Sequence, residues 1–78
     1  MDERQFEKIA AEINKAAKEH KKMAMFHFQV LKHAHQLLDE DAEEFCNRVK
    51  VPESYATEFH KMLSLARLIE EQDVVIDW

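Results

Sequence analysis

The sequence predicts an all-α fold, a compact bundle of about four helices that forms a single domain over residues 1–78. The chain contains no glycine and only one proline, Pro52, whereas tight β-hairpins need glycine-like residues at positive φ. Good helix formers such as Ala, Leu, Glu and Lys are abundant. Hydrophobic residues make up 46% and charged residues 35% of the chain, a balance typical of folded rather than disordered proteins.

We expect the first helix at about residues 2–19. Asp2 and Gln5 have the spacing of a capping box, with Asp in place of the usual Ser or Thr. The apolar residues that follow recur at helical spacing: Phe6, Ile9, Ala10, Ile13, Ala16 and Ala17. This pattern predicts an amphipathic helix with one buried face.

We expect the second helix at about residues 22–38. Its apolar face comprises Met23, Phe26, Val30, Leu31, Ala34, Leu37 and Leu38. Since neither glycine nor proline separates it from the first helix, one continuous helix is an alternative. We favour a break near residues 19–22, because this point is the most polar and so long a rod is uncommon in a small domain. The alternating pattern of residues 23–30 leaves a short strand as a further alternative.

Two more helices are expected after the acidic segment 39–41. Asp41 and Glu44 again have capping-box spacing and open a helix at about 41–50. Pro52 marks a boundary before a last helix at about 53–72. The inward stripe of that helix is Tyr55, Ala56, Phe59, Met62, Leu63, Ala66 and Ile69, whereas Leu65 and Leu68 lie off it and indicate a helix covered on two sides. The tail, residues 73–78, is expected to fold back or to pair with another subunit.

The net charge of −5 weighs against nonspecific binding to nucleic acid. The charge is unevenly distributed, however. Residues 15–33 contain five lysines and one glutamate, whereas residues 39–44 contain five acids and no base. A basic face is therefore compatible with the negative total.

Several classes of function are not expected. Cys46 is the only cysteine, which excludes an intramolecular disulfide and a paired-cysteine zinc site. None of the five histidines has a partner at i, i+4, so we expect neither a metal site nor another cofactor. The inward position of Cys46 argues against a catalytic nucleophile, and we expect no enzyme activity. The sequence lacks a secretory signal and a membrane-spanning run, so the cytoplasm is the expected location.

Residues 42–61 carry the pattern of a helix-turn-helix unit. A small residue lies where two helices would cross, apolar residues flank the turn, and apolar residues face inward on the second helix: Cys46, Val49, Val51, Ala56 and Phe59. Close crossing of two helix axes requires a small side chain at the contact. The segment resembles the helix-turn-helix family, and the chain as a whole is similar to small bacterial proteins with helix-turn-helix-like domains.

Two features depart from that family. Its turn usually contains glycine, whereas this sequence has Lys50 there and Pro52 two residues later. The second helix is also net acidic, although Lys and Arg make the common DNA contacts. The resemblance implies that the start of the second helix would contact DNA through Ser54, Tyr55, Thr57, Glu58 and Lys61. Basic residues nearby would contact phosphates: Lys15, Lys18, Lys21, Lys22 and Arg48.

Apolar residues beyond a single stripe indicate either a centrally packed helix or a partner surface. The candidates for a protein interface are Met25, Phe28, Leu65, Leu68 and Trp78. The leading hypothesis is therefore a non-enzymatic helical interaction module that binds a protein partner or itself as a homodimer. The alternative is a helix-turn-helix DNA-binding transcriptional regulator, and a metal-binding protein ranks third.

Overall fold

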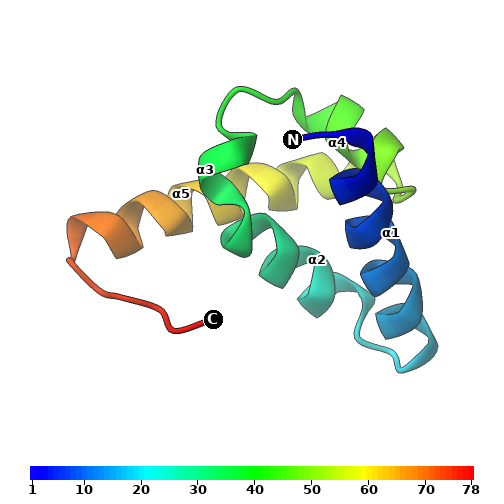
Figure 1. Ribbon diagram of the computed structural model, residues 1–78, viewed down its shortest axis with the longest axis horizontal. Helices are drawn as coiled ribbons and strands as arrows, with labels where there is room; N and C mark the ends of the chain where they lie inside the picture. Colours follow the sequence, from blue (N-terminus) through cyan, green and yellow to red (C-terminus); the bar gives the residue numbers. More distant parts are fainter.

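The computed structural model describes residues 1–78 and contains helices but no strands (Figure 1). The elements in chain order are α1 (Glu3–Lys18), α2 (Lys22–Lys32), α3 (Ala34–Leu37), α4 (Ala42–Arg48), a 3₁₀ turn η1 (Glu53–Tyr55) and α5 (Ala56–Glu71). The predicted all-α class is confirmed, and the strand alternative for residues 23–30 is wrong because these residues lie in α2. No helix has the length and apolar composition needed to cross a membrane.

The start of α1 is fixed by its own side chains. The Asp2 carboxylate accepts a hydrogen bond from the backbone N–H of Gln5 at 3.0 Å, and the Gln5 side chain accepts one from the backbone N–H of Asp2 at 3.0 Å. These reciprocal bonds satisfy two of the donors that a helix leaves free at its first turn. The buried face of α1 is Phe6, Ile9, Ile13 and Ala16.

Three elements end in the same way, although the chain has no glycine. His20, Lys50 and Asp73 adopt left-handed backbone conformations with φ of 61°, 62° and 57°. In each case the N–H of the next residue donates to a carbonyl five residues back, as the bond from Val51 to Cys46 at 3.0 Å illustrates. This geometry caps the last carbonyls of a helix and normally favours glycine. The first of these turns separates α1 from α2.

The expected helix 22–38 is interrupted, which corrects that prediction. His33 leaves the helical conformation, with φ −105° and ψ 18°, and α3 restarts at Ala34. No glycine or proline marks this point, so apolar spacing alone could not reveal it. The bend lets the short α3 bury Ala34 and Leu37 where it meets α5. Tertiary packing therefore decides where the second helix ends.

The core is built around Phe45 of α4. Its ring centroid lies 6.1 Å from that of Phe6, 5.9 Å from that of Phe26 and 5.1 Å from that of Phe59. These rings come from α1, α2, α4 and α5, and all four side chains are fully buried. Tilted aromatic contacts of this kind add to the burial of apolar surface. One residue thus joins the four longer helices.

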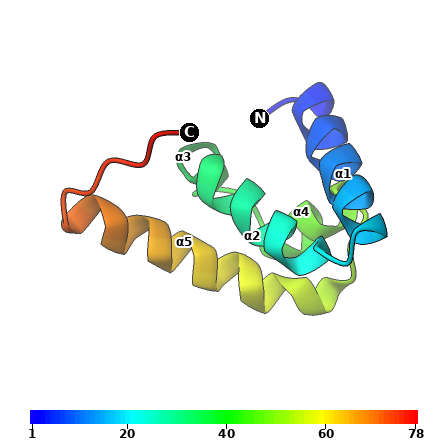
Figure 2. The ribbon, with the colours of Figure 1, turned by 90° about the horizontal axis from the view of Figure 1, so that it is seen from below.

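The last helix is buried only near its start. Phe59 is the one fully buried residue of α5, while Met62, Leu63 and Ile69 are half-buried. In Figure 2, α5 runs along one side of the molecule, and the tail turns back beside its C-terminal half. The expectation of a helix covered on two sides is wrong for the single chain, since Leu65 and Leu68 are 38% and 48% exposed.

Candidate nucleic-acid interface

The turn between α4 and η1 keeps the buried apolar flanks expected of a helix-turn-helix connection. Cys46, Val49 and Val51 are buried in the same apolar cluster as Phe59. Lys50 lies between the two valines and takes the left-handed conformation, with φ 62°. Lys50 therefore takes the left-handed backbone conformation that glycine usually takes in this family's turn.

Burial also determines the chemistry of Cys46. Desolvation, followed by the charges of Glu53 and Glu43, raises the pKa of its thiol. A buried thiol with a raised pKa stays protonated, and only the thiolate is an effective nucleophile. Cys46 therefore acts as a small apolar side chain at the centre of the bundle.

Three of the predicted DNA contacts lie in the open at the start of the second helix. Ser54 is exposed on η1, and Thr57 and Lys61 are exposed on the first turns of α5. Thr57 and Lys61 are four residues apart, so they share one helix face. These three side chains form the exposed start of the candidate recognition element.

Tyr55 is in a different environment from its neighbours. Its ring meets that of Phe26 edge-on at 5.1 Å, and the Lys22 ammonium lies 5.5 Å from its centroid. Tyr55 is half-buried and packs against the core. It therefore links the start of α2 to η1 and holds Lys22 close to the recognition element.

Glu58 also lies in a defined contact. Its Oε1 is 2.8 Å from His27 Nε2, and its Oε2 is 3.1 Å from Lys61 Nζ. The hydrogen bonds from His27 and then Lys61 lower the pKa of Glu58. The negative charge expected on the DNA-facing side is thus held between two basic side chains, one of them on α2.

We call Lys21, Lys22 and Lys50 the lysine cluster; Lys22 lies 5.5 Å from the ring centroid of Tyr55 in η1, while Lys21 and Lys50 lie in the α1–α2 turn and the α4–η1 turn. The α1–α2 turn and the start of α5 lie at the same end of the molecule (Figure 2). Lys22 and Lys50 line one groove between α1 and the α4–η1 turn, and none of the three lysines takes part in an ion pair. Lys22 therefore brings positive charge beside Tyr55 of η1, and the groove it shares with Lys50 is also lined by the acids Glu3 and Glu7.

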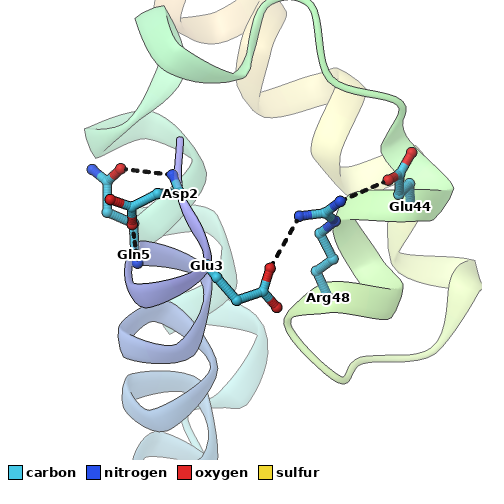
Figure 3. Close-up of polar contacts among 5 residues, drawn as sticks. All are labelled: Asp2, Glu3, Gln5, Glu44 and Arg48. Carbon is cyan, nitrogen blue, oxygen red and sulfur yellow. Dashed lines mark hydrogen bonds and ion pairs between the residues drawn. The ribbon is translucent and has the colours of Figure 1, made fainter.

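Arg48, the last of the predicted phosphate contacts, is already engaged (Figure 3). Its guanidinium lies 3.4 Å from Glu3 and 3.1 Å from Glu44, and it stands 4.8 Å from the centroid of Phe6. These contacts tie α4 to α1. Arg48 therefore contributes less free positive charge than the lysine cluster.

The acidic segment 39–44 lies at the opposite end of α4. Asp41 caps this helix, its carboxylate accepting from the backbone N–H of Glu44 at 3.0 Å. The seven residues of α4 separate Asp41 from the turn at Lys50 by about 10 Å, and Glu43 and Glu44 lie in the first turn of this helix. A carboxylate at the start of the helix and a base at its end also suit the helix dipole.

The histidines do not converge. His27 pairs with Glu58, and His35 pairs with Glu70 at 2.7 Å. Burial, and then the charge of Lys32, lowers the pKa of His33. No group of three or more His, Cys, Asp or Glu side chains is placed to hold a metal ion.

The predicted protein-interface residues lie in different surroundings. Met25 packs against the core, and its Sδ accepts a hydrogen bond from Gln29 Nε2 at 3.4 Å. Phe28 and Trp78 contact each other edge-on at 5.2 Å. Leu65 and Leu68 lie apart from these on α5.

The fold and this end of the molecule define the class, an all-helical helix-turn-helix-like protein. The family model of the HTH-like domain matches residues 1–72, and the chain belongs to this family. No curated protein and no solved structure matches the chain. The match extends well beyond residues 42–61, so α1 and α2 are parts of the family's domain.

Sequence reasoning missed two parts of this site. Lys50 counted only as a departure from the family's turn, although its left-handed backbone keeps the turn and its side chain adds charge. The pairing of His27 with Glu58 joins residues 31 positions apart, and spacing could not reveal it. The left-handed turn could have been predicted, because Lys50 stands at the position where the family has glycine.

Proposed function

We propose that the protein is a non-catalytic regulator that binds duplex DNA through the exposed start of η1–α5 and the lysine cluster. Ser54 and Thr57 are the candidate contacts to DNA from the second helix, while Lys61, which is exposed, is paired with Glu58. Lys21, Lys22 and Lys50 are the candidate phosphate contacts. The sequence alone ranked a protein-binding role above this one.

The observation that carries the proposal is the left-handed Lys50 between buried Val49 and Val51, beside an open η1–α5 start. It supports a helix-turn-helix angle between α4 and α5 and adds a cation at the turn. Two objections from the sequence lose weight. Glycine is absent but its conformation is kept, and Glu58 is paired with His27 and Lys61.

The local charge supports the same proposal. The lysine cluster is free of ion pairs, whereas the acids 39–44 lie at the other end of α4. DNA affinity depends on local cations that displace counterions from phosphates, rather than on net charge alone. A chain of net charge −5 should therefore bind weakly and in one orientation.

The test is fluorescence anisotropy of labelled duplex DNA, titrated with the protein at low and moderate salt. We compare wild type with the Lys21→Gln/Lys50→Asn variant, in which Asn tolerates the left-handed position. The control is Lys8→Gln/Lys32→Gln, which changes the net charge equally but alters a groove between α1 and α2 that excludes the lysine cluster.

Wild type should bind more tightly at low salt, and loss of two phosphate contacts should flatten the log–log salt slope by about 2. The control should keep most of the wild-type slope. Equal losses of DNA affinity in both variants would show that net charge alone causes the effect. No binding by wild type at low salt would contradict the proposal and leave protein binding as the better hypothesis.

A further inference from the structure

The outer side of the C-terminal half of α5 carries an uncovered apolar stripe. Leu65 and Leu68 follow Phe59 by six and nine residues, which turns them about 120° and 180° away from it around the helix. The tail does not cover them, because its Val74, Ile76 and Trp78 line a groove with inner residues of α5 such as Leu63 and Ala66. Neither the bundle nor the tail therefore occupies this side.

Leu65 and Leu68 are the large apolar residues of α5 that stay exposed, at 38% and 48%. If the same stripe of a second copy packs against them, one patch removes apolar surface from water on both subunits.

We propose that α5 of a second copy covers this stripe, antiparallel, about a two-fold axis that passes between Leu65 and Leu68. Leu65 then lies against Leu68 of the second copy, and the reverse contact follows from symmetry. The same patch serves both subunits.

The charges along α5 favour the antiparallel arrangement. Lys61 precedes the two leucines, while Glu71 and Asp73 follow them, and all three are exposed. Antiparallel pairing centred between Leu65 and Leu68 places Lys61 opposite the segment 71–73 of the second copy, so unlike charges meet at both ends. A parallel pair would place Lys61 beside Lys61 and Glu71 beside Glu71, and like charges repel.

The pairing also sets the distance between the two recognition elements, a consequence that rests on the proposed DNA binding. From the rise per residue, the two copies of Thr57 lie about 30 Å apart and the two copies of Ser54 about 40 Å apart. One turn of DNA, about 34–36 Å, lies between these values. The DNA site should then be two-fold symmetric, with half-sites one turn apart.

The first test is the mass of the full chain by sedimentation, without DNA, from micromolar to millimolar concentration. Wild type should approach twice 9.3 kDa, and Leu65→Glu/Leu68→Glu should stay at 9.3 kDa while keeping its helical circular dichroism. Leu38→Glu/Val75→Glu also adds two acids at exposed apolar positions and should still dimerise. A wild type that stays monomeric throughout, or a control that fails equally, would overturn the pairing.

The second test fixes the orientation by disulfide cross-linking. Single variants Leu65→Cys and Leu68→Cys are oxidised separately and as a mixture. The antiparallel pair predicts that the mixed 65–68 product forms in excess over either self-product, while a parallel pair predicts the reverse and would overturn the proposal. Cys46 is fully buried and stays out of the reaction. A monomeric wild type that binds DNA would refute the pairing alone, and a dimer that binds no DNA would refute only the proposed function.

Discussion

The N-terminal half of α5 and its C-terminal half lie in different surroundings. Phe59, in the first half, is fully buried against Phe45, and Glu58 is held by His27 of α2. The second half has no fully buried residue and leaves Leu65 and Leu68 open. The first half is therefore fixed by the bundle, as a recognition element should be, and the second is free to meet another molecule.

The different surroundings of its two halves suit α5 to two proposed roles, DNA contact and self-association. Side chains that are proposed to contact DNA must be held by packing beneath them, and buried Phe59 supplies that support for the first turns of α5. An exposed apolar stripe on the same helix costs solubility unless something covers it. The two proposed roles, DNA contact and self-association, thus fall on different halves of α5.

The largest expected effect tests the anchoring of the first half. Phe59→Ala should lower the free energy of unfolding by about 3–5 kcal/mol, because it leaves a cavity beside Phe45. Leu68→Ala, measured at low concentration where the chain is monomeric, should change it by about 0.5 kcal/mol or less. Urea denaturation gives both values. Similar losses of unfolding free energy in the two variants would show that both halves of α5 are anchored equally.

A smaller effect concerns the turn before the first half. Lys50→Gly should stabilise the protein by about 1 kcal/mol, because glycine takes the left-handed conformation without a Cβ clash. Ala11→Gly, on the exposed face of α1, should destabilise by about 1 kcal/mol and serves as the control. Thermal unfolding measures both, and a destabilised Lys50→Gly would refute the assigned turn geometry. The same variant should bind DNA less well, which separates binding from stability.

Removing the acid left open at the recognition end should have a modest effect on binding. Glu53 is exposed on η1 and takes part in no ion pair. Glu53→Gln should tighten DNA binding a few-fold, because one charge that repels phosphate is lost. Glu12→Gln, on α1, makes the same change in net charge and should tighten binding less. Equal anisotropy curves for the two variants would place the DNA elsewhere.

The smallest effect is the pH dependence of the Glu58 contact. Since its folded pKa is lowered, Glu58 contributes stability above the ordinary glutamate pKa of about 4.3, and this is lost as pH falls through the folded value. The melting temperature of Glu58→Gln should therefore drop less than that of wild type as pH falls below this range. Glu12→Gln should follow wild type. Parallel curves for wild type and Glu58→Gln would show that the contact does not stabilise the fold.

Much of the fold was predictable because periodicity and capping are local. The spacing of Phe6, Ile9 and Ile13 and the Asp2–Gln5 capping box predicted α1, and the structure shows both. The break at His33 was not predictable, since no residue there disfavours a helix and the bend arises from packing on α5. The same holds for η1, which replaces the first turn of the expected helix 53–72.

The candidate site was only partly predictable, because ion pairing depends on tertiary contacts. The exposed positions of Ser54, Thr57 and Lys61 follow from helix periodicity. The engagement of Arg48 with Glu3, across 45 residues, and the inward placement of Tyr55 required the folded chain. These contacts decide which basic side chains remain available for phosphate.

The most direct test of the two-halves account follows backbone amide chemical shifts of the labelled protein while duplex DNA is added at low salt. The account predicts that the shifts concentrate at residues 20–22 and 50–61, and that residues 65–78 move little. It also predicts that dilution without DNA moves residues 61–73 instead. Shifts concentrated at 65–78 on addition of DNA, or no shifts at all, would contradict the assignment of DNA contact to the first half of α5.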